Sequence, residues 1–171
     1  MKAFIAYFSR KGNNYVSGSV VNLSVGNTEV AAKKIQALTG GDLFEIQTAH
    51  SYSEDYHRCT GEAKKELREN ARPKLAGTLP NPDGYDVLYL GYPNWWGTMP
   101  MGVFTFLENY DLRGKTILPF CTHEGSGMGR SEADIKKLSP GAAVFQGLAI
   151  SGSHVSQADR DIESWIKKFS F

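Results

Sequence analysis

Apolar residues along the chain form short, nearly continuous runs. These alternate with stretches in which apolar residues recur every three or four positions. A continuous apolar run is typical of a strand that is covered on both faces. The runs predict five strands, and the fifth is the weakest because glycine and other small residues dilute it: 2–8, 42–46, 86–92, 115–121 and one within 142–150.

The stretches between these runs predict five helices, because their apolar residues line one face at helical spacing. Serine followed three residues later by aspartate has the spacing of a capping box, which marks where a helix begins. This spacing occurs at Ser131–Asp134 and again at Ser156–Asp159. The predicted helices are 28–38, 62–71, 101–110, 131–138 and a last one that opens near Ser156.

Strands that alternate with helices through the whole chain indicate an α/β protein with a parallel sheet and helices on both faces. The chain has 171 residues, well below the ~250 residues at which single cores stop growing. No internal repeat or interdomain linker interrupts the pattern. We therefore expect one doubly wound domain over residues 1–171.

Charge and cysteine content exclude several classes of protein. Lys and Arg number 19 against 18 Asp and Glu, so the formal net charge is +1. This balance gives no electrostatic footprint for nucleic acid or an anionic membrane. Cys59 and Cys121 match neither a disulfide framework nor a metal-binding pair. No apolar stretch approaches the ~20 residues that span a bilayer, and the first residues look like a strand and not a signal peptide. A cytoplasmic location is expected.

Ligands of an open parallel sheet bind beyond the carboxyl ends of the strands. The connection after the first strand runs from Ser9 to Asn27, much longer than the usual 2–6 residues. It ends in Gly26-Asn27-Thr28 at the start of a helix. Unpaired N–H groups and the positive end of the helix dipole favour an anion there. The alternative is an ordinary helix cap made by Asn27 or Thr28.

The connection after the third strand contains two adjacent tryptophans between turn-forming residues. Neighbours in an extended segment point in opposite directions, so Trp95 and Trp96 cannot both face a core. We expect a flat apolar ligand to cover the exposed indole. The alternative is that one indole packs inside and the other is simply tolerated outside.

The connection after the fourth strand is rich in glycine, with Gly125, Gly127 and Gly129 following Thr122. Glycines leave backbone N–H groups free near a ligand. His123 and Glu124 are either polar contacts at the edge of such a ligand or solvated loop residues.

Motifs for other chemistry are missing from the sequence. There is no GxSxG elbow for a hydrolase, no GxxxxGK[ST] loop for a nucleoside triphosphate and no GxGxxG after the first strand. Cys121 and Arg130 are too far apart to bracket the cradle of a cysteine phosphatase. The four histidines are scattered without metal-ligand spacing, so we expect neither a metal site nor a catalytic residue.

These three connections together resemble the loops of the flavodoxin-like family. The serine-bearing loop with Gly26-Asn27-Thr28 is similar to the family's phosphate loop, and segments 91–97 and 122–127 are similar to its two flavin-embracing loops. The resemblance covers essentially the whole chain and implies a five-stranded sheet of order 2-1-3-4-5 with FMN at the switch between strands one and three. One departure is an insertion over residues 10–25, which extends the first loop.

The resemblance also implies which residues bind the cofactor. Trp96 is preferred as the residue that stacks on the flavin, and Arg10 is a possible charge partner of the phosphate. The implied FMN-binding residues are Ser9, Arg10, Gly26, Asn27, Thr28, Pro93, Asn94, Trp95, Trp96, Gly97, Thr122, His123, Glu124, Gly125, Ser126 and Gly127.

Three functions are compatible with such a protein. The first is an electron carrier between a partner reductase and an acceptor protein. The second is an FMN-dependent NAD(P)H:quinone or nitro-compound oxidoreductase of the same fold. The third is a flavodoxin-like domain that has lost FMN and only binds partners. Carriers of this family are typically strongly acidic, which the charge of +1 does not match, whereas no second nucleotide site is visible to support the enzyme. The double tryptophan argues against the third function.

Overall fold

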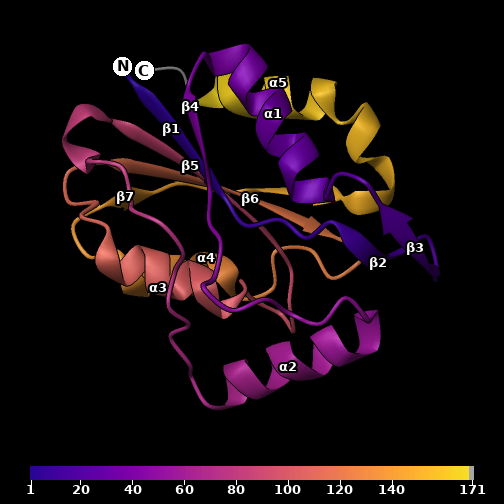
Figure 1. The fold of residues 1–171 in the computed structure, drawn as a ribbon. Helices are drawn as coiled ribbons and strands as arrows, with labels where there is room; N and C mark the ends of the chain where they lie inside the picture. The colour runs from indigo at the N-terminus through magenta and orange to yellow at the C-terminus, as the bar shows by residue number, and fades with distance from the viewer. Residues whose placement is uncertain (170–171) are drawn as a thin grey trace.

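A parallel sheet of six strands forms the centre of the computed structural model, which describes residues 1–169 (Figure 1). The order of five strands is β4-β1-β5-β6-β7. β8 also pairs with β6, farther along that strand than β7 does. The last two strands together occupy the predicted fifth strand, so the predicted order 2-1-3-4-5 is confirmed. The strands are β1 (Ala3–Tyr7), β4 (Asp42–Glu45), β5 (Val87–Pro93), β6 (Thr116–His123), β7 (Ala143–Val144) and β8 (Leu148–Ser151).

The predicted fifth strand is divided because Gly147 passes close to β6. A Cβ atom on Gly147 would lie 2.8 Å from the carbonyl oxygen of Pro119. β7 pairs with Thr116 and Ile117, and β8 resumes pairing at Phe120. Glycine permits this close approach of two backbones, and the Gly147 N–H donates to Glu132 Oε2 at 2.9 Å and not to β6.

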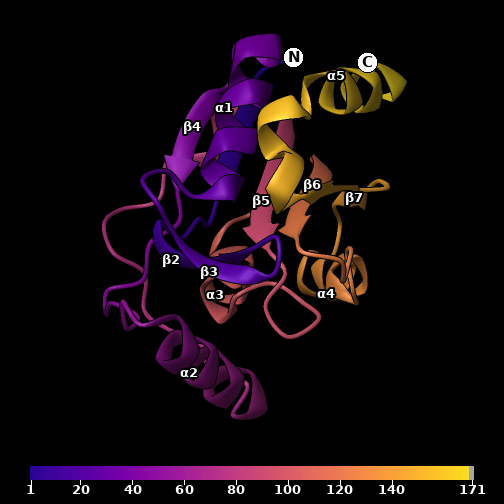
Figure 2. The same cartoon turned by 90° about the vertical axis from the view of Figure 1, so that its right-hand side faces the viewer.

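Two helices cover each face of the sheet. Alternate residues of β1 face opposite layers, so Ile5 packs with α1 and α5, whereas Phe4 packs with α3 and α4. Figure 2 shows α1 and α5 together on one side and α3 and α4 on the other. Burial on both faces explains the continuous apolar runs of β1, β5 and β6. These helices are α1 (Asn27–Thr39), α3 (Met101–Asn109), α4 (Ser131–Leu138) and α5 (Asp159–Lys168).

The remaining helix, α2 (Tyr56–Arg68), begins six residues before the predicted 62–71. Asp55 caps it by accepting a hydrogen bond of 2.9 Å from the Arg58 N–H. Its buried residues Cys59 and Ala63 extend the predicted apolar face by one turn. In both views α2 lies beyond the carboxyl ends of the strands and not against the sheet (Figures 1 and 2).

The two predicted capping boxes are wrong. The Ser131 hydroxyl is buried, where it donates to the Met128 carbonyl and accepts a hydrogen bond from the Tyr92 hydroxyl, and Asp134 accepts from Thr98. Both side chains therefore form hydrogen bonds with residues outside the helix and do not cap it. Ser156 lies inside a 3₁₀ helix, η2 (Gly152–Gln157), and α5 begins only at Asp159. A second 3₁₀ turn, η1, covers Pro82–Gly84.

The insertion in the first loop forms an antiparallel hairpin of its own, β2 (Gly12–Val16) and β3 (Ser19–Leu23). Its two-residue turn has positive φ at Ser17 (51°) and Gly18 (88°), which matches the right-handed twist of hairpin strands. The hairpin lies beside α2 at the carboxyl end of the sheet (Figure 2). Over residues 1–169, none of the helices is both long and apolar enough to cross a membrane.

Candidate functional site

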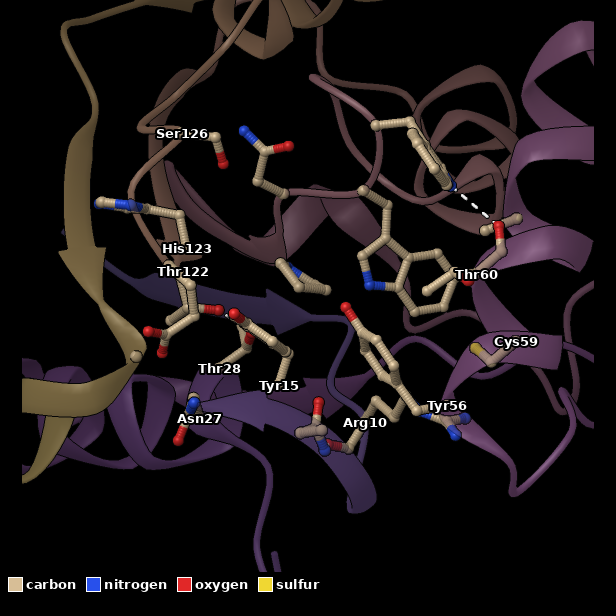
Figure 3. Close-up of a pocket in the computed structure, with 18 residues that line it drawn as sticks. Arg10, Tyr15, Asn27, Thr28, Tyr56, Cys59, Thr60, Thr122, His123 and Ser126 are labelled. Carbon is tan, nitrogen blue, oxygen red and sulfur yellow. Dashed lines mark hydrogen bonds between the residues drawn. The ribbon is translucent and has the colours of Figure 1, made fainter. Parts of the chain in front are cut away.

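A cavity of about 480 Å³ opens at the carboxyl ends of β1, β5 and β6 (Figure 3). Its volume lies within the ~300–1,000 Å³ of small-molecule sites. Segments from all three predicted loops meet on its wall. The predicted residues that line it are Arg10, Asn27, Thr28, Pro93, Asn94, Trp95, Trp96, Thr122, His123, Glu124 and Ser126.

The other predicted residues lie nearby but do not line this cavity. Ser9 and Gly26 line a neighbouring cavity of about 520 Å³ on the other side of the β1 loop. Gly97, Gly125 and Gly127 belong to the same two loops as the lining residues, but their atoms are not on the wall.

Ser9 supports α1 from outside the helix. Gly26 occupies the N-cap position and has no side chain that could cap. The Ser9 hydroxyl, from the end of β1, instead accepts a 3.1 Å hydrogen bond from the Glu29 N–H. A Cβ atom on Gly26 would collide with the Ser9 hydroxyl and lie 2.7 Å from the Arg10 carbonyl oxygen. The close approach of α1 to the β1 loop thus requires glycine.

The first N–H groups of α1 remain available for a ligand. Across residues 1–169, no protein acceptor pairs with the backbone N–H of Asn27 or Thr28, and both residues line the cavity. Their N–H groups and the helix dipole give this end of the cavity the character of an anion site. Glu124 also lines the cavity, and its negative charge is opposite in sign to the positive end of the α1 dipole.

The β5 loop turns sharply at the second tryptophan. Trp96 (φ 59°) and Gly97 (φ 87°) are the central residues of a two-residue turn that Trp95 and Thr98 close. Trp95 packs edge-on against Phe8 at 5.1 Å between ring centroids. Trp96 is 47% exposed. The two indoles therefore do not both pack in the core, as predicted, but the reason is the turn at Trp96 and not an extended segment.

Contacts with α2 fix the exposed indole. The Trp96 Nε1–H donates a 2.9 Å hydrogen bond to the Thr60 carbonyl oxygen, which Figure 3 marks with a dashed line. The Lys64 ammonium lies 4.9 Å from the ring centroid, a cation–π distance. One face of the Trp96 ring is thereby covered.

Asn94 joins the β5 and β6 loops into one wall. Its side-chain nitrogen donates to the Gly127 carbonyl oxygen at 2.8 Å, and its side-chain oxygen accepts from the Gly97 N–H at 2.9 Å. Its backbone N–H donates to the Thr122 carbonyl oxygen at 2.9 Å. His123 is held within its own loop, because its Nδ1 accepts a 2.8 Å hydrogen bond from the Gly125 N–H.

The hairpin connects two sides of the cavity. At its tip, the Ser17 N–H donates to Glu124 Oε2 at 3.3 Å, and the hydroxyl of Ser17 donates to the hydroxyl of Ser153 at 2.9 Å. Ser153 in turn donates to Glu124 Oε2 at 2.7 Å. We call the contact of Ser17, Glu124 and Ser153 the hairpin latch.

At the base of the hairpin, Arg10 holds the segment before α2. Its Nη2 donates to the carbonyl oxygens of Ser53 (2.9 Å) and Glu54 (3.0 Å), and its Nε donates to that of Asn13 (3.2 Å). The guanidinium therefore fastens backbone, while its charge still borders the cavity.

Sequence reasoning missed the part of the wall that comes from the hairpin and α2. The burial of Cys59 raises the pKa of its thiol, so the thiol is neutral at physiological pH. In Figure 3, Tyr56, Cys59 and Thr60 lie across the cavity from His123 and Ser126. The spacing of Cys59 and Ala63 was visible in the sequence, but the predicted helix started too late to use it. The missed lining residues are Asn14, Tyr15, Tyr56, Cys59, Thr60, Ala63 and Gly152.

The possible metal ligands of residues 1–169 do not cluster, and both cysteines in this part of the chain are buried. No group of three His, Cys, Asp or Glu residues is placed to hold a metal ion in this part of the chain. Cys121 is fully buried in β6, and burial raises its pKa to about 12. The cavity thus offers donors, aromatic faces and one carboxylate, which suits binding of a ligand that brings its own chemistry.

Comparison with known proteins gives one family and several solved structures. A family model described as flavodoxin matches residues 2–169. A provisionally named flavoprotein from Bacteroides eggerthii is 30% identical, with 99% of this chain and 98% of that one covered and a TM-score of 0.79. One from Bacteroides uniformis is 29% identical, with 97% of each chain covered and a TM-score of 0.76.

A third solved structure is more distant. It is a flavoprotein from Lactobacillus acidophilus in complex with FMN, 20% identical, with 96% of this chain and 98% of that chain covered and a TM-score of 0.65. At that identity the likeness concerns the fold alone. No match was found among the curated proteins.

Proposed function

Because the chain belongs to the flavodoxin family, we propose that it binds FMN and carries electrons between redox partner proteins. The observation that carries this proposal is the meeting of a helix N-terminus, two indoles and the end of β6 around one cavity. When bound, FMN supplies the capacity to accept and release electrons. The residues of the chain hold and orient it.

The α1 end of the cavity suits the phosphate. The N–H groups of Asn27 and Thr28 have no protein acceptor in the described chain, and Gly26 lets the backbone approach closely. The Asn27 amide adds another donor. Of residues 1–169, no lysine lines the cavity, so we assign phosphate binding to N–H groups and the helix dipole, with Arg10 as a cationic side chain on the cavity wall.

The flavin ring fits the opposite, aromatic part of the cavity. Trp95 is fixed by Phe8 and Tyr52, at 5.1 and 5.2 Å between ring centroids. Trp96 has Lys64 over one face, so only its other face can stack on a flavin. Both indoles line the cavity. We propose that the two indoles and the β6 loop together position the ring.

A second candidate function is an FMN-dependent NAD(P)H:quinone oxidoreductase. It is supported by the net charge of +1, since a carrier that is steered to basic partners is expected to be strongly acidic. It is also supported by the extension of the cavity past the three predicted loops to α2, which leaves room for a small acceptor.

Titration of the flavin-free protein with FMN tests the proposal. We expect saturable quenching of flavin fluorescence at one FMN per chain, and weaker binding in Asn27→Ala. Asn22→Ala, a change in the hairpin at a residue that does not line the cavity, is the matched control. Absence of saturable binding by the unaltered protein would overturn the proposal.

Steady-state oxidation of NAD(P)H separates the two candidates. With FMN bound and tetramethyl-1,4-benzoquinone present, turnover only after addition of a separate flavodoxin reductase identifies the carrier. Turnover by the purified protein alone identifies the oxidoreductase.

A further inference from the structure

Two tyrosines from outside the three predicted loops border the cavity. Tyr15 is on β2 of the inserted hairpin, and Tyr56 is the first residue of α2. Their ring centroids are 6.2 Å apart and their planes are inclined by 26°. Both line the cavity, and Figure 3 shows them facing into it from the side opposite Ser126.

The two rings form an aromatic surface that the protein leaves uncovered. Tyr15 is 45% exposed, which is unusual for a ring at the wall of a cavity, because large aromatic groups gain from burial. Its cross-strand partner in the hairpin is Val20, which is also exposed but does not line the cavity. The two side chains are on the same face of the hairpin, and of the two only Tyr15 reaches the wall of the cavity.

The hydroxyl groups of both tyrosines lack partners. Within residues 1–169, neither phenol makes a hydrogen bond to another protein group, although Tyr85, Tyr92 and other tyrosines do. Partial burial raises the pKa of Tyr56, so its hydroxyl stays protonated and can donate. This end of the cavity thus presents flat aromatic faces with hydrogen-bond donors at their edges.

The β5 and β6 loops form the wall of the cavity opposite the two tyrosines. Asn94 binds the β5 and β6 loops directly to one another, and the β6 loop over residues 122–130 contains no Phe, Tyr or Trp. A flat ligand that lies against this wall meets the two phenol rings on the side of the hairpin and α2.

We propose that Tyr15 and Tyr56 form a binding face for a flat conjugated ring that bears carbonyl oxygens. The rings stack on the ligand and the phenol hydroxyls donate to its carbonyl oxygens. This inference rests on the proposed function, which supplies two ligands with this chemistry. One is the flavin ring of FMN, and the other is a quinone acceptor.

The test compares two substitutions at each tyrosine with a matched control. Tyr→Leu keeps an apolar side chain and removes the flat ring, whereas Tyr→Phe keeps the ring and removes the donor. Asn22→Ala alters the same hairpin at a residue that neither lines the cavity nor pairs with Tyr15. Circular dichroism establishes whether each variant is folded. If the Tyr→Leu variants do not fold, the Tyr→Phe variants still test the hydrogen-bond donors.

Two ligands distinguish the two sources. FMN is titrated into flavin-free protein by fluorescence. Tetramethyl-1,4-benzoquinone is titrated by calorimetry into both flavin-free and FMN-loaded protein. This quinone carries a methyl group at every ring carbon where a thiol could add, so it does not form an adduct with the Cys59 thiol on the same wall. Cyclohexane-1,4-dione, which has the carbonyl groups without a flat conjugated ring, is the control ligand.

We expect Tyr15→Leu and Tyr56→Leu each to raise the dissociation constant of one of the two ligands by about threefold to tenfold, the range for a lost aromatic stacking contact. An effect on FMN assigns the face to the cofactor, and an effect on the quinone with FMN unchanged assigns it to the acceptor. Unchanged constants for both ligands would show that the pair only packs the hairpin against α2 and would overturn the inference. Failure of the unaltered protein to bind FMN instead contradicts the proposed function, while the quinone titration still tests the face.

Discussion

The side-chain hydroxyls of Thr28 and Thr122 share a hydrogen bond of 2.7 Å, although the residues are 94 positions apart in the chain. Both side chains are buried. Thr28 lies in the first turn of α1 and Thr122 near the end of β6. The bond therefore holds the helix N-terminus against the neighbouring loop at the cavity wall.

Replacing one of these threonines should destabilise the fold. Thr122→Val keeps the shape of the side chain but leaves the Thr28 hydroxyl buried without its partner. We expect the free energy of unfolding to fall by about 1–3 kcal/mol, measured by urea denaturation. The double variant Thr28→Val with Thr122→Val should recover part of this loss, because no orphaned hydroxyl remains. Thr105→Val, at a buried threonine that bonds only to its own helix, is the control. Strict additivity of the two valine substitutions would contradict the prediction.

Gly26 should not tolerate even one additional carbon atom. In Gly26→Ala the Cβ would meet the Ser9 hydroxyl and the Arg10 carbonyl oxygen, and such overpacking costs about 1–3 kcal/mol. FMN affinity should fall with it, because α1 must move away from the β1 loop. Gly61→Ala is the control, since Gly61 lies within α2 with open space at its Cβ position. It should raise the free energy of unfolding by about 0.5–1 kcal/mol. Equal effects of the two substitutions would refute this account.

The hairpin latch should slow the release of FMN. Ser153→Ala removes the hydrogen bonds to Glu124 and Ser17 and leaves the tip of the hairpin held only by the 3.3 Å bond from the Ser17 N–H to Glu124. We expect faster amide exchange at Ser17 and an FMN dissociation rate about threefold to tenfold higher, a net effect of about 1 kcal/mol for the two exposed hydrogen bonds together. Ser156→Ala changes a hydroxyl in the same 3₁₀ helix that makes no hydrogen bond within residues 1–169, and it should leave both rates unchanged. A dissociation rate that is the same in Ser153→Ala would show that the hairpin does not restrain the cofactor.

Glu45 should make the protein less stable as the pH rises from 4 to 7. Partial burial and the nearby Glu29 carboxylate raise the pKa of Glu45. The folded chain then holds this proton more tightly than the unfolded chain, so the contribution to stability is present below the ordinary pKa and is lost as the pH rises through the raised one. Glu45→Gln should accordingly unfold at higher urea than the unaltered protein at pH 7, with little difference at pH 4.

The gain in Glu45→Gln is expected to stay below about 1 kcal/mol, because solvent screens a partly exposed carboxylate. Glu69→Gln, at an exposed carboxylate without an ion pair in the described chain, is the surface control. A difference between Glu45→Gln and the unaltered protein that grows toward pH 4 would have the wrong sign and would contradict the assignment.

The sequence by itself determined the sheet and the edge of the sheet at which the cavity lies. Continuous apolar runs identified the strands, because burial on both faces leaves no polar alternation. The carboxyl ends of parallel strands meet at one edge, so Thr28, Trp95 and Thr122 had to come together there. The same reasoning could not find the start of α2, because Asp55 caps it after a stretch without apolar periodicity.

Only the tertiary structure decided how the surface segments close the cavity. The sequence marked residues 10–25 as an insertion, but it predicted neither the hairpin nor where the hairpin lies. That position depends on Arg10 binding the carbonyl oxygens of Ser53 and Glu54 and on the latch to Glu124. Periodicity reports which face of an element is buried, whereas contacts between two surface segments depend on side chains that meet only after the sheet has formed. For this reason the pairing of Tyr15 with Tyr56 follows from the fold and not from the pattern of the chain.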